Sequence, residues 1–378
     1  MKFKNAVICH DDFTFRTGGF TVNEGVFECF EESEEGIDLN GDYVIPGLID
    51  VHFHGNSGED FSVTDQKGLT KIAAYLAKHG ITSFAPASMT MPEAVLKAAY
   101  ENAALFRDIQ PDGTSRIIGI NMEGPFFSSA KKGAHAEEHL MLPDTAMFER
   151  LFKASDGLLK IVCIAPELPG ALEFINKAKD RCTVSIAHTT ADYETAKKAI
   201  TAGVTQITHL YNAMPSFSHR APGVIGAAAE SKQVFAELIC DGVHIHESVI
   251  RATFAMFSSE RIILVSDSLS CLGMPDGFYE SGGQKVSTKN GAAVLEDGTL
   301  AGSATNLFQC MKKAVSFGVR AEDAIRAASI NPAKALKADK RVGSIALGKA
   351  ADFVICDKNY IIKQCFIGGK PVQPEKFL

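Results

Sequence analysis

The stretch that decides the fold is residues 46–55, "PGLIDVHFHG", in which an apolar run ends in two histidines, His52 and His54. A short apolar run of this kind is consistent with a buried strand. In a strand, residues two apart point to the same side, so both imidazoles can face one site. The two histidines are therefore either metal ligands or polar residues at a strand tip, and the rest of the chain has to decide between these readings.

The middle of the chain alternates between apolar, β-branched runs and helical patterns. We predict eight strands, mostly apolar throughout, as in parallel strands covered on both faces. They span residues 48–54, 81–86, 117–123, 159–165, 182–188, 204–209, 234–241 and 261–267. Strand–helix alternation repeated eight times predicts an α/β fold, a (β/α)8 TIM-type barrel. An open doubly wound sheet is the alternative, although no GxGxxG follows the first strand.

The first predicted helix lies in "TDQKGLTKIAAYLAKHG" (64–80), where apolar residues recur at i, i+3, i+4 and i+7. Thr64 is the expected N-cap, and Gly80 is expected to end the helix. Two more helices are expected in "MPEAVLKAAYENAALFRDI" (91–109) and "TADYETAKKAITAG" (190–203).

The two ends of the chain differ from the middle. Residues 1–47 and 343–378 hold short strand-like pieces separated by glycine-containing turns such as "NEG" and "LNGD". Neither end is long enough to be a stable domain alone, so we expect the two to pack together as one small β domain beside a barrel of residues 48–342. Residues 284–303, with "EDG" as the turn, are expected to form a hairpin before a helix at about 304–318.

Composition excludes several classes of protein. The 378 residues carry a formal net charge of -7 and contain no basic block, which argues against a nucleic-acid partner. No apolar stretch approaches membrane-spanning length, and the N-terminus turns polar too soon for a signal peptide. Nine cysteines, an odd number without a CxxC pair, indicate buried thiols in a reducing cytosol, so we expect a cytoplasmic protein without a membrane partner.

Ionisable residues stand at the ends of the predicted strands. Besides His52 and His54, they are Glu123, His188, His209, His244 and Asp267. In a barrel, the C-terminal ends of the strands converge on the face where the active site is built. Any one of these residues has an ordinary structural explanation, but their joint placement favours a site. Imidazole nitrogens and carboxylate oxygens suit Zn²⁺, Fe²⁺ or Mn²⁺, and a catalytic site leaves one position open for water.

Several motifs make the resemblance to a known family specific. "PGLIDVHFHG", "NMEGPF", "KKGAH", "AHTTA", "THLYNAM", "DGVHI" and "VSDS" are similar to motifs of the amidohydrolase superfamily, and more closely to its N-acetylglucosamine-6-phosphate deacetylase family. The HxH pair identifies only the superfamily, whereas "MEGPF" together with "THLYNAMP" is much more specific. The resemblance covers nearly the whole chain and implies a metal-dependent barrel with a small β-sandwich built from both termini.

The resemblance also assigns roles to individual residues. It implies that Glu123, His188 and His209 bind the principal metal and that Asp267 is the catalytic acid/base. The substrate-binding positions that it implies are Ala134, His135, Asn212, Ala213, Leu300, Ala301 and Gly302, with Arg220 and His244 on the 6-phosphate. Family dimers share the phosphate site between subunits, so a homodimer is expected. Lys131 and Lys132 are interpreted as a solvated face.

Members of the family differ at the first strand, where some lack the HxH pair. Because this chain keeps it, we predict a second metal bound by His52 and His54, with Glu123 bridging; a single metal remains the alternative. The implied substrate is an N-acetylated amino-sugar phosphate. Another amidohydrolase, acting on a cyclic amide or a different N-acyl sugar phosphate, is the other enzymatic reading, although strand four ends in "CIAPE" without the lysine common in such enzymes. A barrel that has lost its metal and serves only in binding is disfavoured because every ligand is present.

Overall fold

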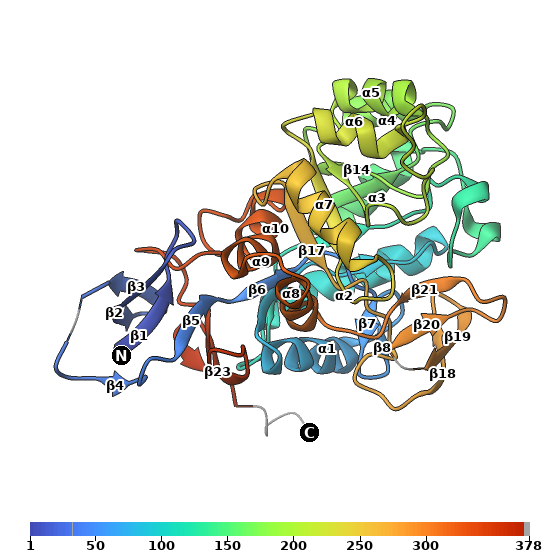
Figure 1. Cartoon of the computed structure of the whole chain (residues 1–378). Helices are drawn as coiled ribbons and strands as arrows, with labels where there is room; N and C mark the ends of the chain where they lie inside the picture. The colour runs from blue at the N-terminus through green and yellow to red at the C-terminus, as the bar shows by residue number, and fades with distance from the viewer. Residues whose placement is uncertain (32, 290, 374–378) are drawn as a thin grey trace.

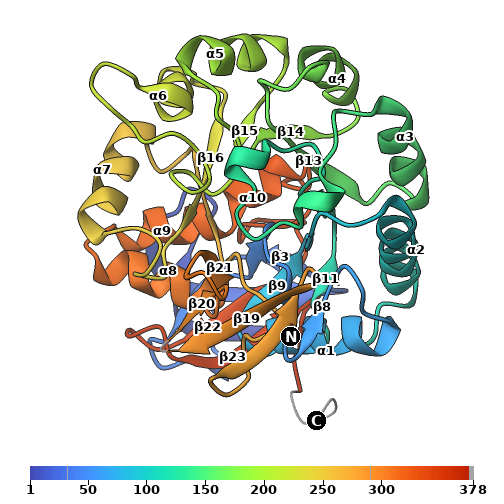
Figure 2. The same cartoon turned by 90° about the vertical axis from the view of Figure 1, so that its right-hand side faces the viewer.

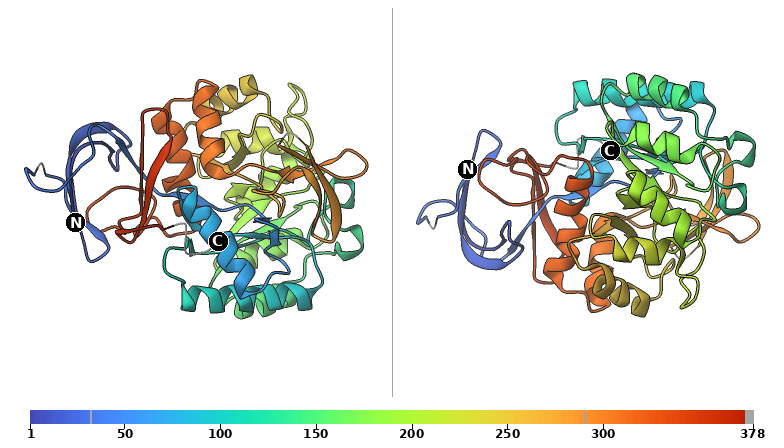
Figure 3. Two further views of the ribbon diagram at one scale, coloured as in Figure 1. Left: turned by 90° about the horizontal axis from the view of Figure 1, so that it is seen from below. Right: turned by 90° about the horizontal axis from the view of Figure 1, so that it is seen from above.

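The computed structural model describes residues 1–31, 33–289 and 291–373 of the chain. In the centre of the molecule, helices surround a curled parallel sheet, and a separate β layer lies at each end of the molecule (Figure 1). The β layer made from the two chain termini and the one made from residues 277–303 lie at opposite ends of the molecule (Figure 3). The curled sheet between them carries the candidate site.

Each of the eight predicted strand runs contains a strand, although the strands are shorter than predicted. They are β6 (Leu48–Asp50), β9 (Ile81–Phe84), β11 (Arg116–Ile117) with β12 (Ile120–Met122), β13 (Leu159–Ile164), β14 (Thr183–Ile186), β15 (Gln206–Ile207), β16 (Phe235–Ile239) and β17 (Ile262–Val265). A short strand, β10 (Ala87–Ser88), follows β9. All these strands pair in parallel, in a seven-stranded sheet ordered β10-β12-β13-β14-β15-β16-β17 and a three-stranded sheet ordered β11-β9-β6.

Backbone hydrogen bonds connect the two parallel sheets. On one side, Asn121 lies in the segment that carries β11 and β12, and Pro86 lies in the segment that carries β9 and β10. The N–H of Asn121 donates to the carbonyl of Pro86 at 2.9 Å. On the other side, Asp267 N–H donates to the carbonyl of His52 at 2.9 Å, which brings the end of β17 beside the end of β6. The residues that follow β6, the first strand, and β17, the last, are therefore hydrogen-bonded to each other. Figure 2 shows strands β13 to β16 near the middle of the molecule, with helices on their outer side.

Ten α-helices are found in the described residues, most of them around the curled sheet. They are α1 (Gln66–Lys78), α2 (Glu93–Ile109), α3 (Thr145–Ala154), α4 (Ala171–Ala178), α5 (Tyr193–Ala202), α6 (Gly223–Glu230), α7 (Glu247–Phe257), α8 (Leu307–Ser316), α9 (Ala321–Ala328) and α10 (Ile330–Ala335). In α1 the buried face is the predicted one, but the N-cap is Asp65, whose carboxylate accepts from Gly68 N–H at 2.9 Å. Thr64 does not cap the helix, because its hydroxyl donates to Glu59.

Strands from both termini form one continuous sheet. It comprises β1 (Lys2–Cys9), β2 (Phe15–Asn23), β3 (Val26–Cys29), β4 (Ile37–Asp38), β5 (Tyr43–Pro46), β22 (Phe353–Cys356), β23 (Ile362–Ile367) and β24 (Lys370–Pro371). The sheet surrounds its own aromatic core, in which Phe353 lies 4.5 Å from Phe366, 5.3 Å from Phe20 and 5.6 Å from Phe3 between ring centroids. Because β5 leads directly into β6, this sheet fixes the start of the first strand of the curled sheet.

The hairpin expected at 284–303 is part of a larger insert. Four antiparallel strands form it: β18 (Gly277–Ser281), β19 (Gln284–Lys289), β20 (Ala292–Val294) and β21 (Leu300–Ser303). The "EDG" turn joins β20 to β21, as predicted. A small hairpin of β7 (Gly55–Asn56) and β8 (Glu59–Asp60) follows the HxH pair. Ser268 bridges Ser303, so the insert is anchored beside the end of β17.

The described residues can be compared with the two expectations about membrane spans and cysteines. None of its helices is both long and apolar enough to cross a bilayer. All nine cysteines lie in the described residues, and all are free thiols; eight are buried and Cys29 is half-buried.

Candidate metal centre and substrate pocket

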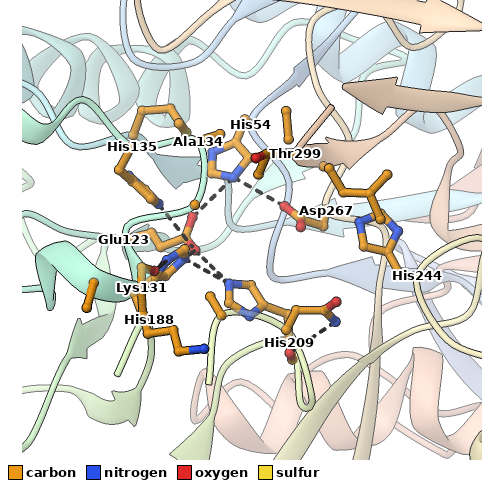
Figure 4. Close-up of a pocket in the computed structure, with 18 residues that line it drawn as sticks. His54, Glu123, Lys131, Ala134, His135, His188, His209, His244, Asp267 and Thr299 are labelled. Atoms are coloured by element: carbon orange, nitrogen blue, oxygen red, sulfur yellow. Dashed lines mark hydrogen bonds and ion pairs between the residues drawn. The ribbon is translucent and has the colours of Figure 1, made fainter. Parts of the chain in front are cut away.

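Six of the predicted site residues come together just beyond the strand ends. His52 and His54 follow β6, Glu123 follows β12, His188 follows β14, His209 follows β15 and Asp267 follows β17. All six are buried, none more than 8% exposed. In Figure 4, the side chains of His54, His135, His188 and His209 point toward that of Glu123. The curled sheet thus assembles one cluster from residues as far apart in sequence as His52 and Asp267.

Three of these residues have left-handed backbone conformations. The φ angles are 45° at His188, 27° at His209 and 49° at Asp267. Non-glycine residues rarely adopt positive φ, and they keep it only when the surrounding structure holds them there. Each of the three follows its strand by two residues, so the left-handed residue ends the extended run and redirects the side chain. The shortness of β14, β15 and β17 has this local cause.

The first group of ligands gathers around one oxygen of Glu123. Oε1 lies 3.2 Å from Nε2 of His188 and 3.1 Å from Nε2 of His209, and the two nitrogens are 3.1 Å apart. Nδ1 of His188 donates to the carbonyl of Lys131 at 2.8 Å, because a carbonyl can only accept. The Nε2 lone pair of His188 therefore points at the group. These are the three residues predicted for the principal metal.

The second group gathers around the other oxygen of Glu123. Oε2 lies 3.1 Å from Nε2 of His52 and 3.1 Å from Nε2 of His54. Nε2 of His54 is also 3.2 Å from Oδ1 of Asp267, which lies 3.6 Å from Nε2 of His52. The carboxylate of Glu123 thus faces one histidine pair with each of its oxygens, which is the arrangement of a bridging ligand.

The cluster contains buried polar atoms that no protein group satisfies. Nε2 of His52 and Oε2 of Glu123 are buried and lack a hydrogen bond in spite of their proximity. Leaving such atoms unpaired costs free energy, so buried polar groups normally have partners. Nitrogen and oxygen atoms that can each offer a lone pair therefore converge on one space, which fits a cation. The donors, four imidazoles and two carboxylates, are those that Zn²⁺, Fe²⁺ or Mn²⁺ prefers.

The electrostatics of the two groups differ. Burial lowers the pKa of His188 to about 4, so this imidazole is neutral at physiological pH and able to bind a metal. Burial also opposes charge on His54, but hydrogen bonds to Asp267 and Glu123 outweigh it and raise the pKa to about 10. The two carboxylates therefore attract positive charge to His54, and a metal bound there would displace a proton.

A cavity of about 330 Å³ opens above the cluster. It is lined by His54, Glu123, His188, His209 and Asp267, together with the predicted substrate-binding residues Ala134, His135, Asn212, Ala213, His244, Leu300, Ala301 and Gly302. Nδ1 of His135 accepts from Thr90 N–H at 3.2 Å, which leaves the proton on Nε2, 3.8 Å from Oε1 of Glu123. His135 can therefore donate a hydrogen bond at the floor of the cavity.

His244 and Arg220 were both predicted to bind a phosphate, and they occupy different environments. His244 lines the cavity, and its Nδ1 lies 2.7 Å from Oδ2 of Asp241. Burial lowers the pKa of His244, but the bond to Asp241 outweighs it, so the net shift is upward. Arg220 is exposed in the loop between β15 and α6 and does not line the cavity of its own chain.

Sequence reasoning missed two residues of the site. Lys131, interpreted as solvated, is half-buried and lines the cavity, and its carbonyl orients His188. Glu237 was not considered, yet its fully buried carboxylate lies 2.7 Å from Nδ1 of His52. The signal for Glu237 was present in the sequence, as a charged residue inside the apolar run "VFAELICD". For Lys131 there was no such signal, because its backbone carbonyl makes the contact.

Comparison with known proteins adds a second line of evidence. Residues 43–372 match the Amidohydrolase family. An N-acetylglucosamine-6-phosphate deacetylase from Bacillus subtilis (strain 168) is 34% identical, covering 93% of this chain and 92% of the relative. An N-acetylgalactosamine-6-phosphate deacetylase from Escherichia coli O157:H7 is 32% identical, covering 92% and 93%. A mutant N-acetyl-D-glucosamine-6-phosphate deacetylase from Mycobacterium smegmatis, in complex with N-acetyl-D-glucosamine-6-phosphate, superposes with a TM-score of 0.91 at 29% identity, covering 98% of this chain and 99% of that one.

Proposed function

This chain belongs to the amidohydrolase family, and from that membership we propose that it hydrolyses the N-acetyl group of N-acetyl-D-glucosamine 6-phosphate. The products are D-glucosamine 6-phosphate and acetate, so the enzyme acts in amino-sugar metabolism, either in catabolism or in recycling of cell-wall sugars. The observation that carries the proposal is Glu123, whose two oxygens face separate histidine pairs at the floor of a sugar-sized cavity.

The residues of the cluster would hold one or two divalent metals. Glu123, His188 and His209 would bind the principal metal, and His52 and His54 would bind a second one that shares Glu123. When bound, such a metal polarises a carbonyl oxygen and lowers the pKa of water to about 7. The close approach of Nε2 atoms around both oxygens of Glu123 supports two positions rather than one.

Asp267 is proposed as the general acid/base. Burial raises its pKa, but the hydrogen bond from His54 and the charges of His52 and His54 outweigh this effect, so Asp267 is ionised and able to accept a proton. It would take a proton from the attacking water and return it to the nitrogen of the leaving amine. His135, whose Nε2–H is set by the hydrogen bond from Thr90, would donate to the oxyanion that forms from the acetamido carbonyl.

The remaining cavity residues would position the sugar phosphate. His244 would be a cationic donor to the 6-phosphate, and Asn212, Ala213, Ala134 and the 300–302 turn would contact the sugar. Arg220 would reach the phosphate site of a second copy of the chain, since it lies outside its own cavity. Binding energy from the phosphate would fix the acetamido group against the cluster.

The same proposal includes the finer architecture and the setting of the enzyme. The curled sheet of residues 48–342 is a (β/α)8 barrel, and residues 1–47 with 343–378 form a β-sandwich domain; of these ranges, residues 32, 290 and 374–378 lie outside the described residues. Hydrogen bonds between the ends of β6 and β17 support the first statement, and the shared sheet of both termini supports the second. A homodimer in the cytoplasm is proposed from the exposed Arg220 and from nine free cysteines, which are typical of a reducing compartment.

An acetate-release assay tests the proposal, with metal content measured on the same sample. We expect turnover of N-acetylglucosamine 6-phosphate that chelation abolishes and divalent metal restores. N-acetylgalactosamine 6-phosphate, which differs at one hydroxyl, is the matched comparison. Preference for that sugar would reassign the substrate, and absence of acetate release from any N-acetylated sugar phosphate by metal-loaded protein would refute the proposal.

A further inference from the structure

Glu237 lies in the middle of β16, between Ala236 and Leu238, with its side chain fully buried. A carboxylate at such a position is costly unless it is well hydrogen-bonded. It is not among the residues that line the substrate cavity. A reason for its presence must therefore be found in its contacts.

Three buried donors surround the carboxylate. Oε1 accepts from Nε2 of Gln206 at 2.5 Å, and Oε2 accepts from the backbone N–H of His209 at 3.2 Å. Oε2 also lies 2.7 Å from Nδ1 of His52, the closest approach between this imidazole and any acceptor. Glu237 therefore touches one residue from each histidine pair, the side chain of His52 and the backbone of His209.

The other histidines of the cluster are oriented differently. Nδ1 of His54 donates to the carbonyl of Ala87 at 3.1 Å, and Nδ1 of His188 donates to that of Lys131 at 2.8 Å. Nδ1 of His209 is buried without a partner. Among the imidazoles of His52, His54, His188 and His209, only that of His52 has a carboxylate within hydrogen-bonding distance of its Nδ1. A carboxylate makes the imidazole a stronger donor of its lone pair than a neutral carbonyl does.

We infer that Glu237 is a positioning residue for the second metal, which it serves by holding the proton of His52 on Nδ1 and directing the Nε2 lone pair toward Glu123. The inference rests on the proposed metal centre. A carboxylate that accepts from a metal-bound histidine fixes its tautomer and ring orientation, and loss of such a partner typically costs 10–100-fold in metal affinity. A buried polar group that only satisfied Gln206 would have no effect on metal binding.

Glu237→Gln is the decisive variant because it keeps the shape of the side chain and removes its charge. We expect the principal metal to remain and the affinity for the second metal to fall about 10–100-fold, measured by titration of Co²⁺ or Zn²⁺ into apoprotein. The metal-induced rise in Tm should shrink, whereas the Tm of the apoprotein should change little. Unchanged affinity for both metals, or loss only of apoprotein stability, would overturn the inference.

Asp50→Asn is the matched control. Asp50 is also buried beside His52, but its carboxylate accepts from the backbone N–H of His52 and from Ser266, and it forms no hydrogen bond with the imidazole among the described residues. Its replacement should leave the second metal in place. Repeating Glu237→Gln in a His52→Asn background should add no further loss, because the imidazole through which Glu237 acts is gone; an additional loss of the same size would contradict the inference.

A measurement on the unaltered protein covers the case in which Glu237→Gln does not fold. Labelling with ¹⁵N-histidine reports the tautomer of each imidazole, and we expect His52, assigned by comparison with His52→Asn, to carry a strongly downfield Nδ1 proton. A proton on Nε2 in the metal-loaded protein would reject the inference. These experiments are independent of acetate release, so a protein that binds two metals through Glu237 but deacetylates no sugar phosphate would refute only the proposed function.

Discussion

Oδ1 of Asp267 lies 3.2 Å from Nε2 of His54, so the proposed acid/base is held against the second group of ligands. Asp267→Asn should reduce kcat by about 10²–10⁴-fold, because the amide can neither accept nor return the proton. KM and metal content should stay close to those of the wild type, since Asn retains an oxygen near His54. Steady-state kinetics with metal analysis decide the matter, and near-normal turnover would remove Asp267 from this role.

The HxH pair should determine metal stoichiometry. We expect that the double variant His52→Ala, His54→Ala lowers the metal content from two per subunit to one, because Glu123, His188 and His209 still form a complete group. Elemental analysis measures this directly. His79→Ala is the control, because His79 is the C-cap of α1, where its Nδ1 donates to the carbonyl of Tyr75, and is not part of the cluster. This variant should bind as much metal as the wild type. Equal metal content in all three proteins would show that the pair holds no metal.

The phosphate should provide most of the substrate's remote binding energy. Unphosphorylated N-acetylglucosamine is expected to have a much lower kcat/KM than the phosphorylated sugar. Arg220→Ala should lower kcat/KM only for the phosphorylated sugar. If the phosphate site is shared between subunits, mixing Arg220→Ala with Asp267→Asn subunits restores activity, because the mixed dimer contains one complete site. Failure of the mixture to recover activity after confirmed subunit exchange would mean that Arg220 does not act across an interface.

The His244–Asp241 pair predicts a pH dependence. Asp241 raises the pKa of His244 above its usual value of about 6.5, so the imidazole stays cationic to higher pH. The contribution of this pair to the free energy of unfolding is fully present below about pH 6.5, and it is lost as the pH rises through the higher pKa that His244 has in the folded protein. In Asp241→Asn, KM for the phosphorylated sugar should therefore begin to rise at lower pH than in the wild type. KM for unphosphorylated N-acetylglucosamine should not respond, and a parallel shift for both sugars would exclude phosphate binding by His244.

The terminal sheet should depend on its aromatic core. Phe353→Ala removes a buried ring that packs against Phe3, Phe20 and Phe366, and it should lower the free energy of unfolding by about 3–5 kcal/mol. Urea denaturation measures the effect. Phe278→Ala provides the contrast, because that ring is 88% exposed on β18 and its loss should change stability by less than about 0.5 kcal/mol. Equal effects of the two substitutions would contradict the assigned core.

Much of the fold followed from local pattern. The eight apolar runs and the spacing of Leu69, Ile72, Ala73 and Leu76 reflect burial, which side-chain chemistry controls directly. The errors are local as well. Thr64 and Asp65 are both good N-caps, and the choice between them depends on Glu59, which takes the Thr64 hydroxyl. The strands were predicted to be too long because no sequence pattern indicates the left-handed backbone conformation at His188, His209 and Asp267.

The sequence by itself determined which side chains stand at the strand ends, because alternation of strand and helix places those ends on one face whatever the exact packing. Only the tertiary structure decided how these side chains are distributed between the two groups of ligands. The two oxygens of Glu123 face different histidine pairs, and Glu237 lies behind His52, 185 positions away in sequence. Such relations depend on the curl of the sheet, which brings side chains in or just beyond β6, β12 and β16 within about 3 Å of one another: His52 lies 3.1 Å from Glu123 and 2.7 Å from Glu237. Spacing along the chain does not determine these distances.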